Sequence, residues 1–206
     1  MKIKVYSDTI CGWCYIGHKR LQNALDQFKN ISFEIVHCPF QLNPDMPLSG
    51  MPRSQYLDIK FGGFNNAKPM YDNMVAQAKS ENLKINFDIV KQTPNTLKSH
   101  FLILYAQQFQ KTSEVLTAIF NSYFTLGQDI GDEEILTAIA NNYFDFDPKL
   151  FQDNQYSNLI AEIKKSDQIA RSMGINGVPF FEINNKAYIS GAQSTSNLVE
   201  AITNNQ

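Results

Sequence analysis

The sequence has few cysteines, little net charge and no long apolar run, and each shortage excludes a class of protein. Three cysteines in 206 residues are too few for a scaffold held together by disulfides. The 18 basic and 20 acidic residues nearly cancel, and the formal charge of −2 leaves no basic footprint for nucleic acid or an anionic membrane. No apolar run reaches the roughly 18 residues that a membrane span needs. We therefore expect neither a nucleic-acid nor a membrane partner.

The start of the sequence also lacks the features of a signal peptide. The segment MKIKVYSDTI before Cys11 contains no apolar stretch of about 7–15 residues followed by a small-residue cleavage site. We expect a cytoplasmic protein on this ground, unless the sequence is a mature form whose leader has been removed. Hydrophobic residues, by contrast, make up 43% of the chain, which is enough for the core of one domain.

A strand–helix–strand unit is predicted at the beginning of the chain. Residues 2–7 alternate apolar and polar side chains as a strand does, and residues 13–29 carry apolar side chains at helical spacing. Residues 31–37 are rich in β-branched and aromatic side chains and predict a second strand. Because a helix of this length joins them, the two strands should be parallel.

The middle of the chain is predicted to be helical and its end to return to strands. After a loop rich in proline, apolar stripes at helical spacing predict helices at 70–78 (weakly), 97–105, 115–123, 135–143 and 159–173. A hairpin turning at Asn184 and Asn185 and a closing helix follow. We therefore predict an α/β domain formed by residues 1–45 and 175–206, with residues 46–174 as a helical insertion.

Cys11 and Cys14 form a Cys-x-x-Cys pair between the first strand and the first helix. Cys11 should lie at the helix N-terminus, where free N–H groups and the helix dipole stabilise a thiolate. Cys14 follows one turn later and can reach that sulfur, so the spacing suits disulfide exchange, with Cys11 as nucleophile and Cys14 as resolving thiol. Half of a zinc site and two inert thiols are the alternatives, although Cys38 and the scattered histidines supply no clear second ligand pair.

Six segments, the first of which contains the Cys-x-x-Cys pair, occur in a fixed order along nearly the whole chain. They are Cys11-Gly-Trp-Cys-Tyr-Ile-Gly-His-Lys-Arg20, Phe40-Gln-Leu-Asn-Pro44, Pro94-Asn-Thr96 with His100, Tyr123-Phe-Thr-Leu-Gly-Gln-Asp-Ile130, Gly174-Ile-Asn-Gly-Val-Pro-Phe180 and Ser190-Gly-Ala-Gln193. This ordered set resembles the DsbA/thioredoxin superfamily and, within it, the cytosolic FrnE-like proteins. Each segment alone would be a weak signal, whereas the ordered set is specific.

The resemblance implies a thioredoxin-like α/β fold with a large helical insertion, and dithiol–disulfide oxidoreductase activity on protein or peptide disulfides. It also implies that the Val178–Pro179 peptide bond is cis, although spacing alone favours an ordinary trans proline. Val178 and Pro179 would then bind the substrate chain, together with a partly exposed Trp13. We expect no resident cofactor, with glutathione as a candidate redox partner.

The chain departs from the family pattern inside the Cys-x-x-Cys motif. Gly12 stands where the family usually has proline, and a glycine loosens the start of the helix. Trp13 stands where DsbA proper has histidine, and an indole supplies no positive charge to a thiolate. We therefore predict a weaker oxidant than DsbA.

Two polar residues near the motif are candidates for tuning it. Val5 stands where thioredoxin carries a buried acid, but Asp8 is closer and could accept the proton of Cys14. We expect Asp8 to be a turn residue just before the helix, with the proton acceptor as the alternative. His100 could approach the site and tune Cys11, as the resemblance suggests, or it could be a structural histidine.

Other residues are expected to have ordinary structural roles. Cys38 should be a small buried hydrophobe, with a regulatory thiol as the alternative. We expect His18 at the surface. Met46, Met51, Met70 and Met74 should fill the core, with a flexible peptide groove as the alternative.

Two other functions compete with disulfide exchange. The same fold includes glutathione-dependent isomerases and transferases of the 2-hydroxychromene-2-carboxylate isomerase and kappa type, which carry serine in place of the first cysteine. The intact Cys11–Cys14 pair argues against that branch. A chaperone or adaptor without redox turnover is the third possibility.

Overall fold

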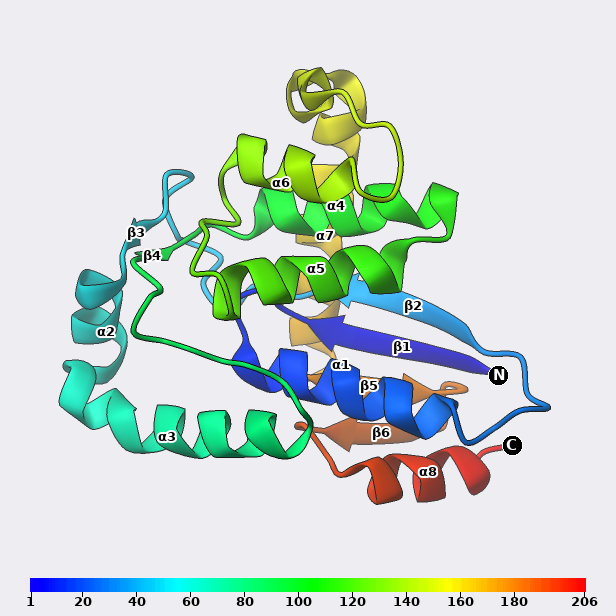
Figure 1. Ribbon diagram of the computed structural model, residues 1–206. Coiled ribbons are helices and arrows are strands. Elements are labelled where there is room, and N and C mark those ends of the chain that lie inside the picture. The colour runs from blue at the N-terminus through cyan, green and yellow to red at the C-terminus, as the bar shows by residue number, and fades with distance from the viewer.

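The computed structural model describes residues 1–206 and contains a four-stranded mixed sheet with helices on both faces (Figure 1). The strand order is β2-β1-β5-β6. Its strands are β1 (Lys2–Ser7), β2 (Glu34–Pro39), β5 (Phe180–Ile183) and β6 (Ala187–Ser190). β2 runs parallel to β1, whereas β5 is antiparallel to both β1 and β6. The predicted α/β architecture, the parallel first pair and the final hairpin are thus confirmed.

The boundaries at the first turn differ from the prediction. The first helix, α1, spans Gly12–Leu25 and ends before residue 29, and β2 begins at Glu34 instead of residue 31. The reason is an aromatic contact that the helical pattern does not reveal. Phe28 leaves the helix and packs edge-on against Phe33, with 5.9 Å between the ring centroids. The residues between α1 and β2 therefore form a turn.

Side chains from alternate positions of β1 support the two faces of the sheet. Ile3 and Val5 pack with Phe181 against α1 and the closing helix α8 (Thr195–Thr203). Tyr6 lies in a separate cluster with Ala170 of α7 (Asn154–Ser172), which passes behind the sheet in Figure 1. The last helix of the predicted insertion therefore supplies the cover of the second face.

The remaining helices contribute most of the largest of the three core clusters. α2 and α3 lie at one side of the sheet in Figure 1, beside the small β3–β4 ribbon, and α4, α5 and α6 lie above it. These elements are β3 (Met51–Pro52), α2 (Arg53–Phe61), α3 (Phe64–Ser80), β4 (Gln92–Thr93), α4 (Leu97–Tyr105), α5 (Thr112–Phe124) and α6 (Glu133–Ala140), with 3₁₀ helices at Ala106–Phe109 and Pro148–Gln152. The weak helix prediction at 70–78 falls inside α3, whereas α2 was not predicted. None of the helices combines the length and the apolar character needed to cross a membrane.

His18 is buried, and the prediction that it lies at the surface is wrong. Its Nε2 lies 2.9 Å from Thr117 Oγ1 of α5, and Gln22, one turn later in α1, donates to Ser113 Oγ of α5 at 3.0 Å. These contacts fix α1 to the helical part of the molecule. Burial, and secondarily the nearby His37, lowers the pKa of His18 from 6.5 to about 3.

The low pKa of His18 predicts a loss of stability in mild acid. The unfolded chain protonates this histidine below pH 6.5, whereas the folded chain keeps it neutral down to about pH 3. Unfolding therefore takes up one proton here, and stability falls by about 1.4 kcal/mol per pH unit as the pH drops through this window. In urea unfolding experiments, His18→Gln should reduce the pH dependence of the free energy of unfolding by that amount between about pH 6 and pH 4.5. A slope equal to that of the wild type would contradict the neutral buried histidine.

Candidate active site

Cys11 is the N-cap residue of α1, as the spacing predicted. Its backbone is extended, with φ −91° and ψ 109°, and its N–H donates to the Asp8 carbonyl at 3.1 Å, which closes the turn after β1. The Cys11 sulfur accepts a hydrogen bond from the Cys14 N–H at 3.3 Å. A thiolate at this position would be stabilised by that N–H and by the positive end of the helix dipole.

Cys14 lies inside the first turn of α1 and is almost completely buried. Both cysteines are free thiols, so the structure represents the reduced form. Burial raises the pKa of the Cys14 thiol well above its usual value, and the neighbouring Cys11 sulfur raises it further. Cys14 is therefore protonated at neutral pH in this form, and it has to lose a proton before it can act as a nucleophile.

The loop before β5 lies directly against Cys11. The Val178–Pro179 peptide bond is cis, and the Val178 carbonyl accepts a hydrogen bond from the Cys11 thiol at 3.5 Å. The other side of the loop is fixed by the Gly191 N–H, which donates to the Pro179 carbonyl at 2.8 Å. Gly17 of α1 permits this packing, because a Cβ there would lie only 2.8 Å from Pro179 Cγ. The structure thus brings Cys11, Val178 and Pro179 together.

A cavity of about 200 Å³ opens beside Cys11, between the start of α1 and the α2–α3 pair. Trp13 is partly buried and lines this cavity, as do Met70 and Met74 of α3. Most of the lining is hydrophobic. Although Cys11 itself is only 6% exposed, it forms part of the cavity wall and is reachable from it.

Gly12 is packed against a side chain that no local pattern could reveal. A Cβ at Gly12 would lie 2.1 Å from Met74 Sδ and 3.3 Å from Met74 Cγ. The thioether of α3 therefore occupies the space that the family's usual proline would need. Gly12 begins α1 in close contact with Met74, which gives it a packing role in addition to the looser helix start expected from its sequence position.

Asp8 is fully buried and joins three elements. Its Oδ2 accepts a hydrogen bond from the Leu42 N–H at 2.7 Å, and its Oδ1 lies 3.3 Å from Nε2 of His100 on α4. The latter contact is close but is not aligned as a hydrogen bond. Asp8 also acts on Cys14: a hydrogen bond to its backbone lowers the pKa of that thiol, and its charge raises it. It is therefore near enough to Cys14 to be considered as its proton acceptor. The side chain of His100 therefore reaches the site through its contact with Asp8.

Cys38 lies in β2 opposite Tyr6 and is partly buried. It packs beside the cluster that faces α7, and burial raises the pKa of its thiol to about 11. These surroundings suit the expected packing role.

Arg53, at the start of α2, is the feature of the site that the sequence did not indicate. It is 8% exposed and lines the same cavity as Cys11. An arginine in an ordinary surface sequence context carries no local signal of burial, so only the tertiary structure identifies it.

The fold and the arrangement around Cys11 define the class of protein. Residues 2–203 match the family model of the DSBA-like thioredoxin domain, so the chain belongs to that family. The uncharacterized protein YwbO of Bacillus subtilis is 26% identical over 216 residues, which cover 99% of this chain and 96% of YwbO.

Solved structures agree with this assignment. A probable DsbA oxidoreductase of Streptomyces coelicolor superposes with a TM-score of 0.87 at 27% identity, covering 99% of this chain and 89% of that one. The cytosolic disulfide reductase DsbM of Pseudomonas aeruginosa, solved with GSH, gives 0.67 at 14% identity, with 99% and 95% covered. A 2-hydroxychromene-2-carboxylate isomerase gives 0.71 at 15%, with 99% and 95% covered, and so shares the fold. The predicted thioredoxin-like fold is confirmed.

The surroundings of the three thiols predict their order of reaction. With iodoacetamide at about pH 8, Cys11 should be alkylated at least about tenfold faster than Cys14 or Cys38, because it lines the cavity whereas burial keeps the other two protonated. Peptide mass spectrometry after timed quenching measures the three rates, and labelling in urea provides the unfolded control. Equal rates for Cys11 and Cys14 in the folded protein would contradict this assignment.

The Gly12–Met74 contact predicts a coupled effect on stability. Gly12→Ala should cost about 1–3 kcal/mol through overpacking, and Met74→Ala about 2–5 kcal/mol through the cavity it leaves. The double variant should cost less than the sum, because the new methyl group takes space vacated by the thioether. Urea unfolding of the four proteins measures the coupling. Gly177→Ala is the matched control, since a Cβ at that position meets nothing within 4 Å.

Proposed function

We propose that this protein is a thiol–disulfide oxidoreductase in which Cys11 is the nucleophile and Cys14 the resolving thiol. One observation carries the proposal: the Cys11 sulfur lies between the Cys14 N–H and the Val178 carbonyl, at the wall of a cavity. Membership of the DSBA-like family supports the same class of reaction. The presence of both cysteines supports it over the isomerase alternative, which needs no resolving thiol.

In the proposed reaction, the Cys11 thiolate attacks one sulfur of a substrate disulfide. A Cys11–substrate disulfide forms, and the other substrate sulfur leaves as a thiolate that takes up a proton. Cys14 then loses its proton and attacks the Cys11 sulfur, which releases the second substrate thiol and leaves a Cys11–Cys14 disulfide. The buried Asp8 carboxylate is the proposed acceptor of the Cys14 proton, with His100 positioning it.

The proposed substrate is a protein or peptide disulfide that lies along the Val178–Pro179 loop. The Val178 N–H has no hydrogen-bond partner within the chain, so it is free to pair with an extended substrate backbone. Trp13, partly exposed at the cavity, would contact the side chains of the substrate. Glutathione is a proposed redox partner, since a structural neighbour, DsbM, was solved with GSH.

We also propose that the protein is FrnE-like and works in the cytoplasm, where the glutathione poise keeps most thiols reduced. Under that poise the resting form would be the dithiol, and substrate reduction or isomerisation fits better than net oxidation. The neutral Trp13 between the cysteines is in line with a weaker oxidant than DsbA.

The division of labour between the cysteines predicts distinct phenotypes. Cys11→Ser should abolish reduction of a peptide disulfide, whereas Cys14→Ser should accumulate a mixed disulfide on Cys11, because nothing resolves it. Mass spectrometry of the intact protein after reaction detects the adduct, and Cys38→Ser should behave like the wild type. A Cys11→Ser,Cys14→Ser protein with unchanged activity, or glutathione-dependent isomerase turnover that survives Cys14→Ser, would contradict the proposal.

A further inference from the structure

Arg53 is a buried cation without an anionic partner. Its side chain is 8% exposed, and none of the ion pairs in the structure includes it. Its Nη2 is buried and has no hydrogen-bond partner. A buried charge left in this state is costly, and in folded proteins such groups are normally paired. The missing anionic partner therefore points to a ligand for Arg53.

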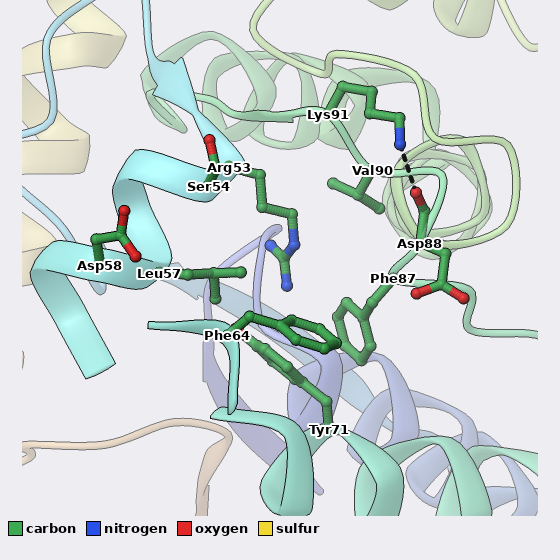
Figure 2. Close-up of a pocket in the computed structure, with 10 residues that line it drawn as sticks. All are labelled: Arg53, Ser54, Leu57, Asp58, Phe64, Tyr71, Phe87, Asp88, Val90 and Lys91. Atoms are coloured by element: carbon green, nitrogen blue, oxygen red, sulfur yellow. Dashed lines mark hydrogen bonds between the residues drawn. The ribbon is translucent and has the colours of Figure 1, made fainter. Parts of the chain in front are cut away.

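The guanidinium is held in a defined position although it lacks a partner. Its Cζ lies 5.0 Å from the ring centroid of Tyr71 and 5.0 Å from that of Phe87. The backbone N–H of Arg53 donates to the Lys91 carbonyl at 2.9 Å, which fixes the start of α2. Figure 2 shows the guanidinium in the middle of the labelled side chains, with Asp58 and Asp88 to either side of it. Aromatic contacts thus orient the group and leave its edge available.

Arg53 connects the cavity beside Cys11 with a second one. Arg53, Tyr71 and Phe87 line both the cavity of about 200 Å³ next to Cys11 and the neighbouring cavity of about 380 Å³ shown in Figure 2. Cys11 and the unpaired guanidinium of Arg53 therefore line the same cavity.

The charged side chains that line the cavity next to Cys11 are all positive. Arg53 and Lys60 line it, and no aspartate or glutamate does. Thr93, which also lines it, has a buried hydroxyl without a hydrogen-bond partner. Two orphaned polar groups on a mostly hydrophobic wall match a ligand that is apolar in its body and anionic at one end.

We infer that Arg53 binds the carboxylate of a small organic disulfide whose sulfur reacts at Cys11. A planar guanidinium matches a carboxylate in two parallel hydrogen bonds, and the aromatic walls accommodate an aromatic or aliphatic body. The inference rests on the proposed oxidoreductase function and adds the substrate class: besides protein or peptide disulfides, the site takes compact, carboxylate-bearing ones.

The reaction balances without any further reagent. The Cys11 thiolate attacks the disulfide sulfur attached to the bound carboxylate half, and the other half leaves as a thiolate. Cys14 then displaces the bound half from Cys11 as a second thiolate, with loss of its own proton. The two cysteines are oxidised to a disulfide, and the substrate disulfide is reduced by the same two electrons to two thiols.

The test compares two aromatic disulfides that differ in charge. The reduced wild-type protein is mixed with 5,5′-dithiobis(2-nitrobenzoic acid), which carries carboxylates, or with neutral 4,4′-dithiodipyridine, and release of the chromophore is followed by stopped flow. Arg53→Met keeps a long apolar side chain between the two rings. It should slow the carboxylate disulfide at least about tenfold and leave the neutral one within about twofold, because one charge-assisted pair is lost.

Matched variants separate a specific contact from a general charge effect. Arg53→Lys keeps the charge but loses the bidentate geometry, so its rate with the carboxylate disulfide should fall between wild type and Arg53→Met. Lys84→Met removes one positive charge from an exposed site outside the cavities and should leave the ratio of the two rates unchanged.

A second measurement needs only the wild-type protein, in case Arg53→Met fails to fold. Millimolar benzoate should slow the reaction with the neutral disulfide by occupying the cavity, whereas isosteric benzamide should not. Equal effects of benzoate and benzamide would overturn the inference, as would an Arg53→Met protein that slows both disulfides equally or neither.

The failure of this inference is distinguishable from failure of the proposed function. If wild type reacts with both disulfides and forms the Cys11–Cys14 disulfide, but the Arg53 variants do not discriminate between them, only the carboxylate site is refuted. If wild type forms no Cys11–Cys14 disulfide with either probe, the oxidoreductase function fails, and the inference about its substrate fails with it.

Discussion

The buried carboxylate of Asp8 is the constraint on which the active site depends. An ionisable group without solvent depends on partners inside the protein: Asp8 Oδ2 accepts a hydrogen bond from the Leu42 N–H, and Oδ1 lies 3.3 Å from His100 Nε2 without forming one. Because these partners come from the loop after β2 and from α4, one residue fixes the end of β1 relative to both. The Asp8 carbonyl then accepts the Cys11 N–H, so the same residue determines where α1 begins.

The position of Cys11 follows from this arrangement. Once the turn is fixed, the Cys14 N–H in the first turn of α1 is directed at the Cys11 sulfur, and the Gly17–Pro179 contact places the Val178 loop on its other side. Cys14, one turn along, is enclosed by the helical part of the molecule, and both cysteines belong to that core cluster instead of to the one under the sheet. The helical insertion therefore encloses Cys14 together with the start of α1.

Most of what could be predicted from the sequence depends on neighbours along the chain. The Cys-x-x-Cys spacing, the strand alternation and the final hairpin are local patterns, and the structure has them where they were expected. The burial of His18, the packing of Met74 on Gly12 and the enclosure of Arg53 depend on helices that are distant in sequence. His18 and Arg53 are polar and look like surface residues in the sequence, and nothing near Gly12 in the sequence points to Met74, so local pattern could not identify these contacts.

The insertion and the thioredoxin-like part divide the chemistry between them. Stabilisation of a thiolate at Cys11 comes from the backbone at the start of α1, where the helix dipole acts over about one turn. The motif itself adds no cation, since Trp13 is neutral. The positive charge of the cavity comes instead from Arg53 and Lys60, both on α2. In the proposed reaction, reactivity and substrate charge are therefore set by different elements, and changes in α2 would alter which disulfide is accepted without altering the Cys11–Cys14 pair.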